Sequence, residues 1–322
     1  MKKAAIILST VVGALVLITL SAPAPGIADE DFIKGLDIGD PVIHENLAVY
    51  PVYLPGGGEK LGDILTMAEA QETGKFKIKE IEEGAEVNTL EVHNNTDKSV
   101  VLLAGEMIRG AKQDRIVSYD TVIPPGGKFN VDAFCVEAGR WEEKSTHFSY
   151  AKEIAPAKVR NAAQGKMDQS EVWSEVSMVN AERGTVTDTD ALTASYDSKE
   201  FKDKVNSYEK AFKDVGKDVD VVGVVVVAEG EVVAGDVFGN HDLFVKMWPR
   251  LLTSYAMDAA LAGDLGDVPT AAEIGTYLAQ LREAEREQVY KDDKQNRSAL
   301  KKGAAEAYEF EYEDNTLHLN MY

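Results

Sequence analysis

The sequence predicts an α+β fold with a β-rich N-terminal half and a C-terminal half of antiparallel hairpins covered by helices. From about residue 34 to 136, short apolar runs alternate with Gly, Pro and Asn clusters, which is typical of successive strands and turns. From residue 198 onward, apolar residues recur at helical spacing between longer β-branched runs. The composition, 44% apolar and 28% charged, is that of an ordinary globular protein.

The chain begins with a pattern typical of a secretory signal. Two lysines are followed by an apolar run from Ala4 to Leu20 and then by small residues up to Ala28. We therefore predict that residues 1–28 are a signal peptide and that the mature protein is exported, periplasmic or extracellular. The apolar run is at the lower edge of the length that spans a bilayer, so an uncleaved anchor is the competing interpretation.

Residues 29–141 are predicted to form a β-rich lobe. Strands are expected at 87–92, 100–103 and 121–123, each bounded by turn residues, and one short helix at 65–73. Residues 142–197 are rich in Ser, Thr and Asp, and we expect them to form a crossover segment with short helices.

Residues 198–322 are predicted to form an α+β lobe packed on the first. Apolar residues spaced by four and three predict a helix over 201–212, with Asp197 as its cap. A second helix is expected over 243–255, where Pro249 should cause a kink or a restart. A capping box at Thr270 predicts a third helix with a charged outer face that extends to about residue 302.

Two hairpins complete this lobe. The first joins 219–228 to 231–238, and its almost continuous β-branched run predicts a strand that is buried on both faces. The second joins 308–312 to 317–321, where apolar and polar residues alternate around an Asp-Asn turn.

The negative net charge limits the kinds of partner that the protein is expected to bind. Asp and Glu number 55 against 34 Lys and Arg, a net charge of -21, so electrostatic binding to nucleic acid or anionic lipid is not expected. We predict no nucleic-acid partner and no membrane association after signal cleavage. A small-molecule or protein ligand, and an oligomer, remain open. Cys135 is the single cysteine, and its place in an apolar alternation predicts a core thiol.

Polar residues gather in two clusters at strand ends, 104–115 and 135–141. One hypothesis is a cleft in which Glu106 and Glu137 act as an acid/base pair. The other is an internal salt-bridge network that fixes two strand ends, in which a buried Glu137 requires a cationic partner. In the first hypothesis both carboxylates face one solvent-open cleft. The residues predicted to bind a ligand there are Arg109, Lys112, Gln113, Arg115, Arg140 and Trp141.

No metal site or cofactor is predicted. His147, His241 and His318 lack the spacing of a helical metal pair, and the paired acids do not follow the calcium-loop pattern. The common hydrolase, P-loop and dinucleotide-binding motifs are absent from the sequence.

Several separated motifs resemble one family. They are 100–106 with 112–115, 124–126, 135–141, and 243–244 with 248–256. Together they are similar to the ARG and rhodanese-phosphatase-superfamily-associated protein domain, an uncharacterised family, over residues 36–320. The family name records an association with ADP-ribosylglycohydrolase-type and phosphatase-type proteins. The resemblance implies at most a loose connection to nucleotide or ADP-ribose chemistry, and it supplies no catalytic residues.

These observations favour a non-catalytic exported binding or interaction protein with a polar groove near the two clusters. Whether the protein is an enzyme stays open. One alternative is a hydrolase that acts on a sugar- or phosphate-containing substrate through Glu106 and Glu137. Another is a self-assembling surface or matrix component, which only the acidity and the export signal suggest.

Overall fold

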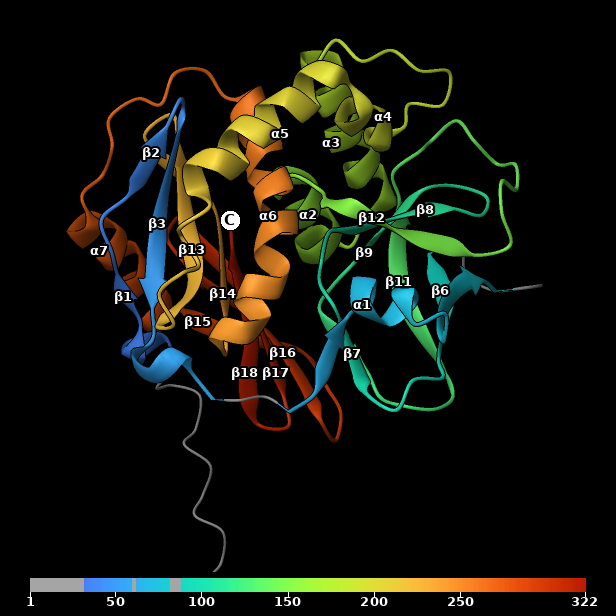
Figure 1. Ribbon diagram of the computed structural model, residues 1–322, viewed down its shortest axis with the longest axis horizontal. Coiled ribbons are helices and arrows are strands. Elements are labelled where there is room, and N and C mark those ends of the chain that lie inside the picture. The colour runs from blue at the N-terminus through green and yellow to red at the C-terminus, as the bar shows by residue number, and fades with distance from the viewer. Residues whose placement is uncertain (1–31, 60–61, 82–87) are drawn as a thin grey trace, which may run out of the picture.

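The computed structural model describes residues 32–59, 62–81 and 88–322, and it has the predicted α+β architecture (Figure 1). The predicted signal peptide, 1–28, lies outside the described residues. Within the described part, no helix is long and apolar enough to cross a membrane.

A nine-stranded sheet forms one side of the molecule, with eight strands in the order β1-β3-β13-β14-β18-β17-β16-β15 and β2 paired to β3. Because β3 pairs antiparallel with β13, the first strands of the chain join a sheet built mainly from the C-terminal half. The strands are β1 Asp37–Ile38, β2 Val42–His44, β3 Leu47–Tyr53, β13 Val221–Ala228, β14 Glu231–Phe238, β15 Glu285–Lys291, β16 Gln295–Lys302, β17 Ala305–Tyr312 and β18 Asn315–Met321. Every residue of β13 is buried, as predicted.

A closed barrel forms the other side, with its strands in the order β11-β6-β5-β12-β8-β9. Buried and half-buried residues alternate along β6, as expected for a strand with one face inside the barrel. The barrel strands are β5 Phe76–Glu80, β6 Thr89–Asn94, β8 Glu106–Gly110, β9 Arg115–Val117, β11 Lys128–Cys135 and β12 Phe148–Ile154. A small sheet of β4 Ile64–Thr66, β7 Ser99–Leu102 and β10 Thr121–Ile123 lies beside it.

Helix α6 stands between the larger sheet and the barrel, while α7 covers the opposite face of the sheet (Figure 1). The helices are α1 Met67–Glu72, α2 Ala157–Asn161, α3 Gln169–Glu182, α4 Leu192–Asp197, α5 Lys199–Phe212, α6 His241–Leu261 and α7 Ala271–Arg282. Two 3-10 turns, η2 Ile33–Gly35 and η3 Pro55–Gly57, and a π-turn, η4 Ala162–Lys166, complete the helical elements.

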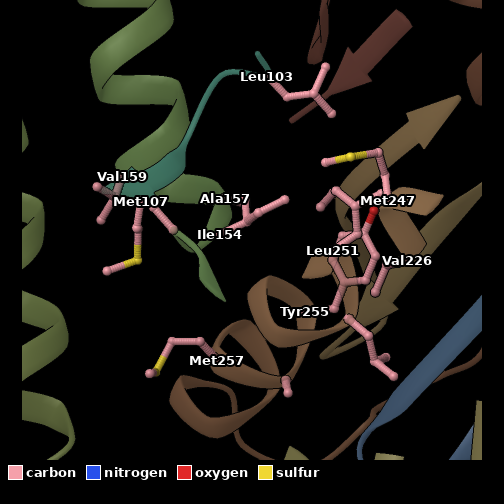
Figure 2. Packing of buried hydrophobic residues seen from close by; sticks show 14 of the residues in the cluster. Leu103, Met107, Ile154, Ala157, Val159, Val226, Met247, Leu251, Tyr255 and Met257 are labelled. Atoms are coloured by element: carbon pink, nitrogen blue, oxygen red, sulfur yellow. The ribbon is translucent and has the colours of Figure 1, made fainter. Parts of the chain in front are cut away.

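The largest core cluster joins the barrel to the sheet through α6 (Figure 2). Met107 comes from the barrel, Val226 from β13, and Leu251 and Tyr255 from α6, and all four are fully buried. Burying a side chain of this size contributes roughly 1.5 to 3 kcal/mol. This shared core therefore holds the two sides of the molecule in a fixed relation. Cys135 is also buried, as predicted for a core thiol.

The local predictions were confirmed for the two hairpins and for most helix starts. Glu229 and Gly230 both have positive φ, 53° and 79°, which suits the tight turn between β13 and β14. The predicted cap of α5 was wrong, because the Ser198 hydroxyl, rather than Asp197, accepts the Phe201 N–H at 3.2 Å. Helix α6 continues through Pro249 without a restart.

The long helix predicted over 270–302 was wrong beyond Arg282. Leu281 is the last buried residue of α7, and the segment that follows has no apolar stripe to pack against the sheet. Asp292 instead accepts the main-chain N–H groups of Lys294 and Gln295, at 2.8 and 2.7 Å, which closes a turn between β15 and β16. The charged segment is therefore a hairpin that extends the sheet.

Candidate functional site

Glu106, the first predicted catalytic carboxylate, begins β8 and is fully buried. It pairs with Arg250 of α6, and it also accepts the main-chain N–H of Leu103 at 2.8 Å. Arg250 donates its other terminal nitrogen to the Ala151 carbonyl oxygen at 3.0 Å. Glu106 thus links the barrel to the central helix.

Glu137, the second predicted carboxylate, is also buried, and its expected cationic partner is Arg140 at 2.6 Å. Burial by itself would raise the pKa of Glu137, but the hydrogen bonds from Arg140, the Asp114 main chain and Thr189 outweigh burial and lower it. The two glutamates therefore face different arginines. The structure does not place them together in an open cleft.

The residues predicted to bind a ligand have internal partners. Arg109 pairs with Asp197 and Glu153, Arg115 with Glu80, and Arg140 with Glu137 and Asp114. The Gln113 amide donates to the Glu137 carbonyl oxygen at 2.7 Å. Lys112 lies 5.2 Å above the Trp141 ring, which is 56% exposed. This last pair and the half-buried Arg109 are the parts of the predicted site that reach the surface.

A buried chain of charged groups, which the sequence did not reveal, crosses the interface between the barrel and the sheet. His318 of β18 lies between two carboxylates, with Nδ1 2.6 Å from Asp120 and Nε2 3.1 Å from Asp236. Asp236 of β14 also pairs with Arg160 of α2 and accepts the Tyr255 hydroxyl at 2.5 Å. All five side chains are essentially inaccessible to solvent.

These contacts fix the charge of His318. Burial alone would lower its pKa, but Asp120 and Asp236 outweigh burial and raise it to about 9. Burial likewise opposes the ionised form of Asp236, yet Arg160 and His318 hold the pKa of Asp236 well below its usual range. At neutral pH the chain therefore consists of alternating charges. In the described part of the protein, no three His, Cys, Asp or Glu side chains gather as a metal site would require.

A groove of about 760 Å³ lies beside this chain, between the barrel and the turn of the β15–β16 hairpin. A smaller recess of about 220 Å³ adjoins it, and both are lined by Tyr119, Asp132, Tyr290 and Arg297. We call the two together the interlobe groove. Its further lining residues are Asp120, Thr121, Val122, Ile123, Pro124, Phe129, Asn130, Val131, Gln164, Met167, Val289, Asp292, Asp293, Lys294, Gln295, Ser298, Tyr308, Glu309, Phe310 and Tyr312.

Exposed apolar side chains gather at the recess. Met167, Val289 and Tyr290 all line it, and they are 46%, 61% and 40% exposed. Val289 lies where the pairing of β15 with β16 shifts register, so a bulge at this point turns its side chain toward the recess instead of continuing the ladder. Asp120 of the buried chain lines the same recess.

Arg297 of β16 is the distinctive side chain of the interlobe groove. Its guanidinium lies 3.5 Å from the centroid of the Tyr119 ring and 4.2 Å from that of Tyr290, and its Nε is buried without a hydrogen-bond partner. Each of the other arginines in the described residues pairs with a carboxylate or donates to a main-chain carbonyl oxygen: Arg109, Arg115, Arg140, Arg160, Arg183, Arg250, Arg282 and Arg286. Arg297 does neither: it hydrogen-bonds to Tyr119 and has Asp292 as an electrostatic neighbour, and its guanidinium lines the groove.

Comparison with protein families gives one match. The model of the ARG and Rhodanese-Phosphatase-superfamily-associated Protein domain matches residues 35–322. The chain belongs to this family. No curated protein and no solved structure matches the chain. The matched region contains both the buried chain and the interlobe groove, so the two features lie within the family domain.

Proposed function

We propose that this protein is an exported, non-catalytic binding protein that holds a small molecule in the interlobe groove. The observation that carries the proposal is Arg297, a cation that two tyrosine rings hold in place without an ion pair. A stacked arginine is fixed in orientation, and its guanidinium carries five N–H donors, only part of which its hydrogen bond with Tyr119 uses. The groove volume lies within the range of about 300 to 1,000 Å³ that is usual for small-molecule sites.

Export is the part of the proposal that depends on the sequence alone. The basic start, the apolar run and the small residues up to Ala28 support it. The hydrolase and self-assembly hypotheses stay predictions. The geometry favours binding over hydrolysis, because Glu106 and Glu137 are each buried against a different arginine.

Ligand-observed NMR on the mature chain, from Asp29 onward, tests the proposal. The compounds are neutral disaccharides, amino acids, dicarboxylic acids and nucleoside monophosphates. We expect saturation transfer to at least one class, lost in Arg297→Ala and retained in Trp141→Ala, which removes the exposed ring of the site predicted from sequence. Loss in Trp141→Ala alone would place the ligand at that other site. No transfer to any class would refute the proposal, provided that a thermal melt shows the protein folded.

A further inference from the structure

We infer that the ligand of the interlobe groove is a neutral saccharide of more than one ring. The inference rests on the proposed function and deepens it by naming the ligand class. Four features of the groove support it: its aromatic surfaces, the balance of its charges, its mixture of exposed donors and acceptors, and its size.

The aromatic surfaces come from both sides of the groove. Tyr119 and Phe129 line it from the barrel side, and Tyr290 lines it from the β15–β16 hairpin, while Tyr312 borders it as a buried ring. A tyrosine presents an apolar face and a polar tip, so it binds best to a partner that also has an apolar face and a polar edge. A sugar ring has both, since its axial C–H groups form an apolar face while its hydroxyls project from the edge.

The charges exclude strongly ionic ligands. Carboxylates outnumber cations along the groove, with Asp132, Asp292 and Asp293 set against Lys294 and Arg297. A multiply charged anion such as a phosphate ester would meet this excess of negative charge. A ligand cation would find the slot between the Tyr119 and Tyr290 rings already filled by a guanidinium, which would repel it. A neutral ligand avoids both penalties.

The polar groups require a ligand that both donates and accepts. The Arg297 Nε is buried, so a ligand can reach only the terminal nitrogens of this side chain, which act as donors. Asp293 is an exposed acceptor, and the amide of Asn130, which is also exposed, both donates and accepts. Hydroxyl groups can serve all three without adding charge.

The size of the site indicates more than one sugar ring. The groove has a volume of about 760 Å³, and the recess adds about 220 Å³ behind the Arg297 stack. The two spaces share four lining residues, so an elongated ligand can occupy both. One ring would stack in the groove while the next reaches toward the recess.

A glycan array with neutral, sulfated, uronate-containing and free-amine oligosaccharides tests the inference, followed by calorimetry with the best-bound glycan. We expect binding to a neutral glycan, and a charged analogue of the same length should bind at least tenfold more weakly. Tyr290→Ala should weaken binding about tenfold, the loss expected for one aromatic stacking surface. Trp141→Ala removes a similarly exposed ring elsewhere and should leave affinity within twofold.

Four outcomes would overturn the inference. Preferred binding of a sulfated or uronate glycan would show that Arg297 selects anions, while preferred binding of an amino glycan would show that the carboxylates dominate. If no glycan binds but an amino acid or nucleotide shows Arg297-dependent NMR transfer, the ligand class is wrong and the binding function stands. If nothing binds in either experiment, both proposals fail.

Discussion

Replacing His318 by glutamine tests whether the buried chain is charged. The ring contributes a cation between two buried carboxylates, and its pKa is raised from 6.5 to about 9 by folding. A shift of this size corresponds to about 3 kcal/mol, because each pKa unit is worth about 1.4 kcal/mol. Since the folded pKa lies above the unfolded one, this stabilisation is fully present below pH 6.5 and is lost as pH rises through 9.

The free energy of unfolding should therefore be measured in urea for wild type and His318→Gln at pH 6, 7, 8, 9 and 10. At pH 6 we expect the variant to be less stable by about 3 kcal/mol for the lost charge. The lost stacking on Phe238, whose ring centroid lies 4.4 Å from that of His318, should add about 1 kcal/mol at every pH. By pH 10 only this second part should remain.

His241→Gln is the matched control, because that ring bonds to the Val221 carbonyl oxygen at 2.7 Å and to no carboxylate. Its destabilisation should not fall between pH 7 and 10. If the His318→Gln difference stayed constant within about 1 kcal/mol over this range, His318 would not be a buried imidazolium, and the charge assignment of the chain would be wrong. A direct NMR titration of the His318 ring would give the same answer independently.

Three further predictions concern stability, each measured by denaturant unfolding. Glu137→Gln should destabilise the protein by about 3 kcal/mol, the lower end of the cost of breaking a buried ion pair, because Asp114 still faces Arg140; no loss would mean that the pair is not structural. Burial raises the pKa of Asp258 from 3.8 to about 7, so this carboxyl costs stability progressively as pH rises from about 4 to 7, and Asp258→Asn should stabilise the protein by about 3 kcal/mol more at pH 8 than at pH 5; an equal effect at both pH values would contradict the raised pKa. Gly105→Ala should cost about 2 kcal/mol or more, because φ is +81° and the new Cβ would lie 2.3 Å from the Arg160 Cγ. Gly126→Ala is the control, because Gly126 has a similar φ of +76° but open space around it, and this variant should cost less. Equal losses in the two variants would contradict the steric reasoning.

Local pattern predicted much of the fold, because helices and hairpins depend on residues that are close in sequence. The capping box at Thr270 and the Glu229-Gly230 turn are examples, and both were found. The β15–β16 hairpin was missed because its charged residues lack a strand alternation, so its place is set by pairing with β17. Closure of the barrel likewise depends on the register between strands that are distant in sequence, and this register could not be inferred from one sequence.

The candidate site was harder to predict for a related reason. The sequence predicted that a buried Glu137 needs a cationic partner without deciding between Arg140, Arg109 and Lys112, and the partner is Arg140, three residues away. Asp120, Asp236 and His318 are separated by 116 and 82 positions, so no sequence motif with a fixed spacing could have shown that they are neighbours. The Arg160 side chain lies against Gly105, 55 positions earlier in the sequence, and this contact likewise has no local signal.

The buried chain and the interlobe groove are connected through one short segment. Asp120, which accepts the Ala104 N–H at 2.7 Å and bonds to His318, immediately follows Tyr119, whose ring faces Arg297 across the groove. The Tyr119 hydroxyl also donates to Asp132 at 2.7 Å, so this ring is held at both its backbone and its tip. A binding surface is most selective when its rings and donors are fixed before the ligand arrives, so in the proposed binding function the interior charges would act on the groove by orienting its wall. On this reasoning, the buried ion chain has two effects: it stabilises the fold through His318, and it fixes the shape of the proposed site.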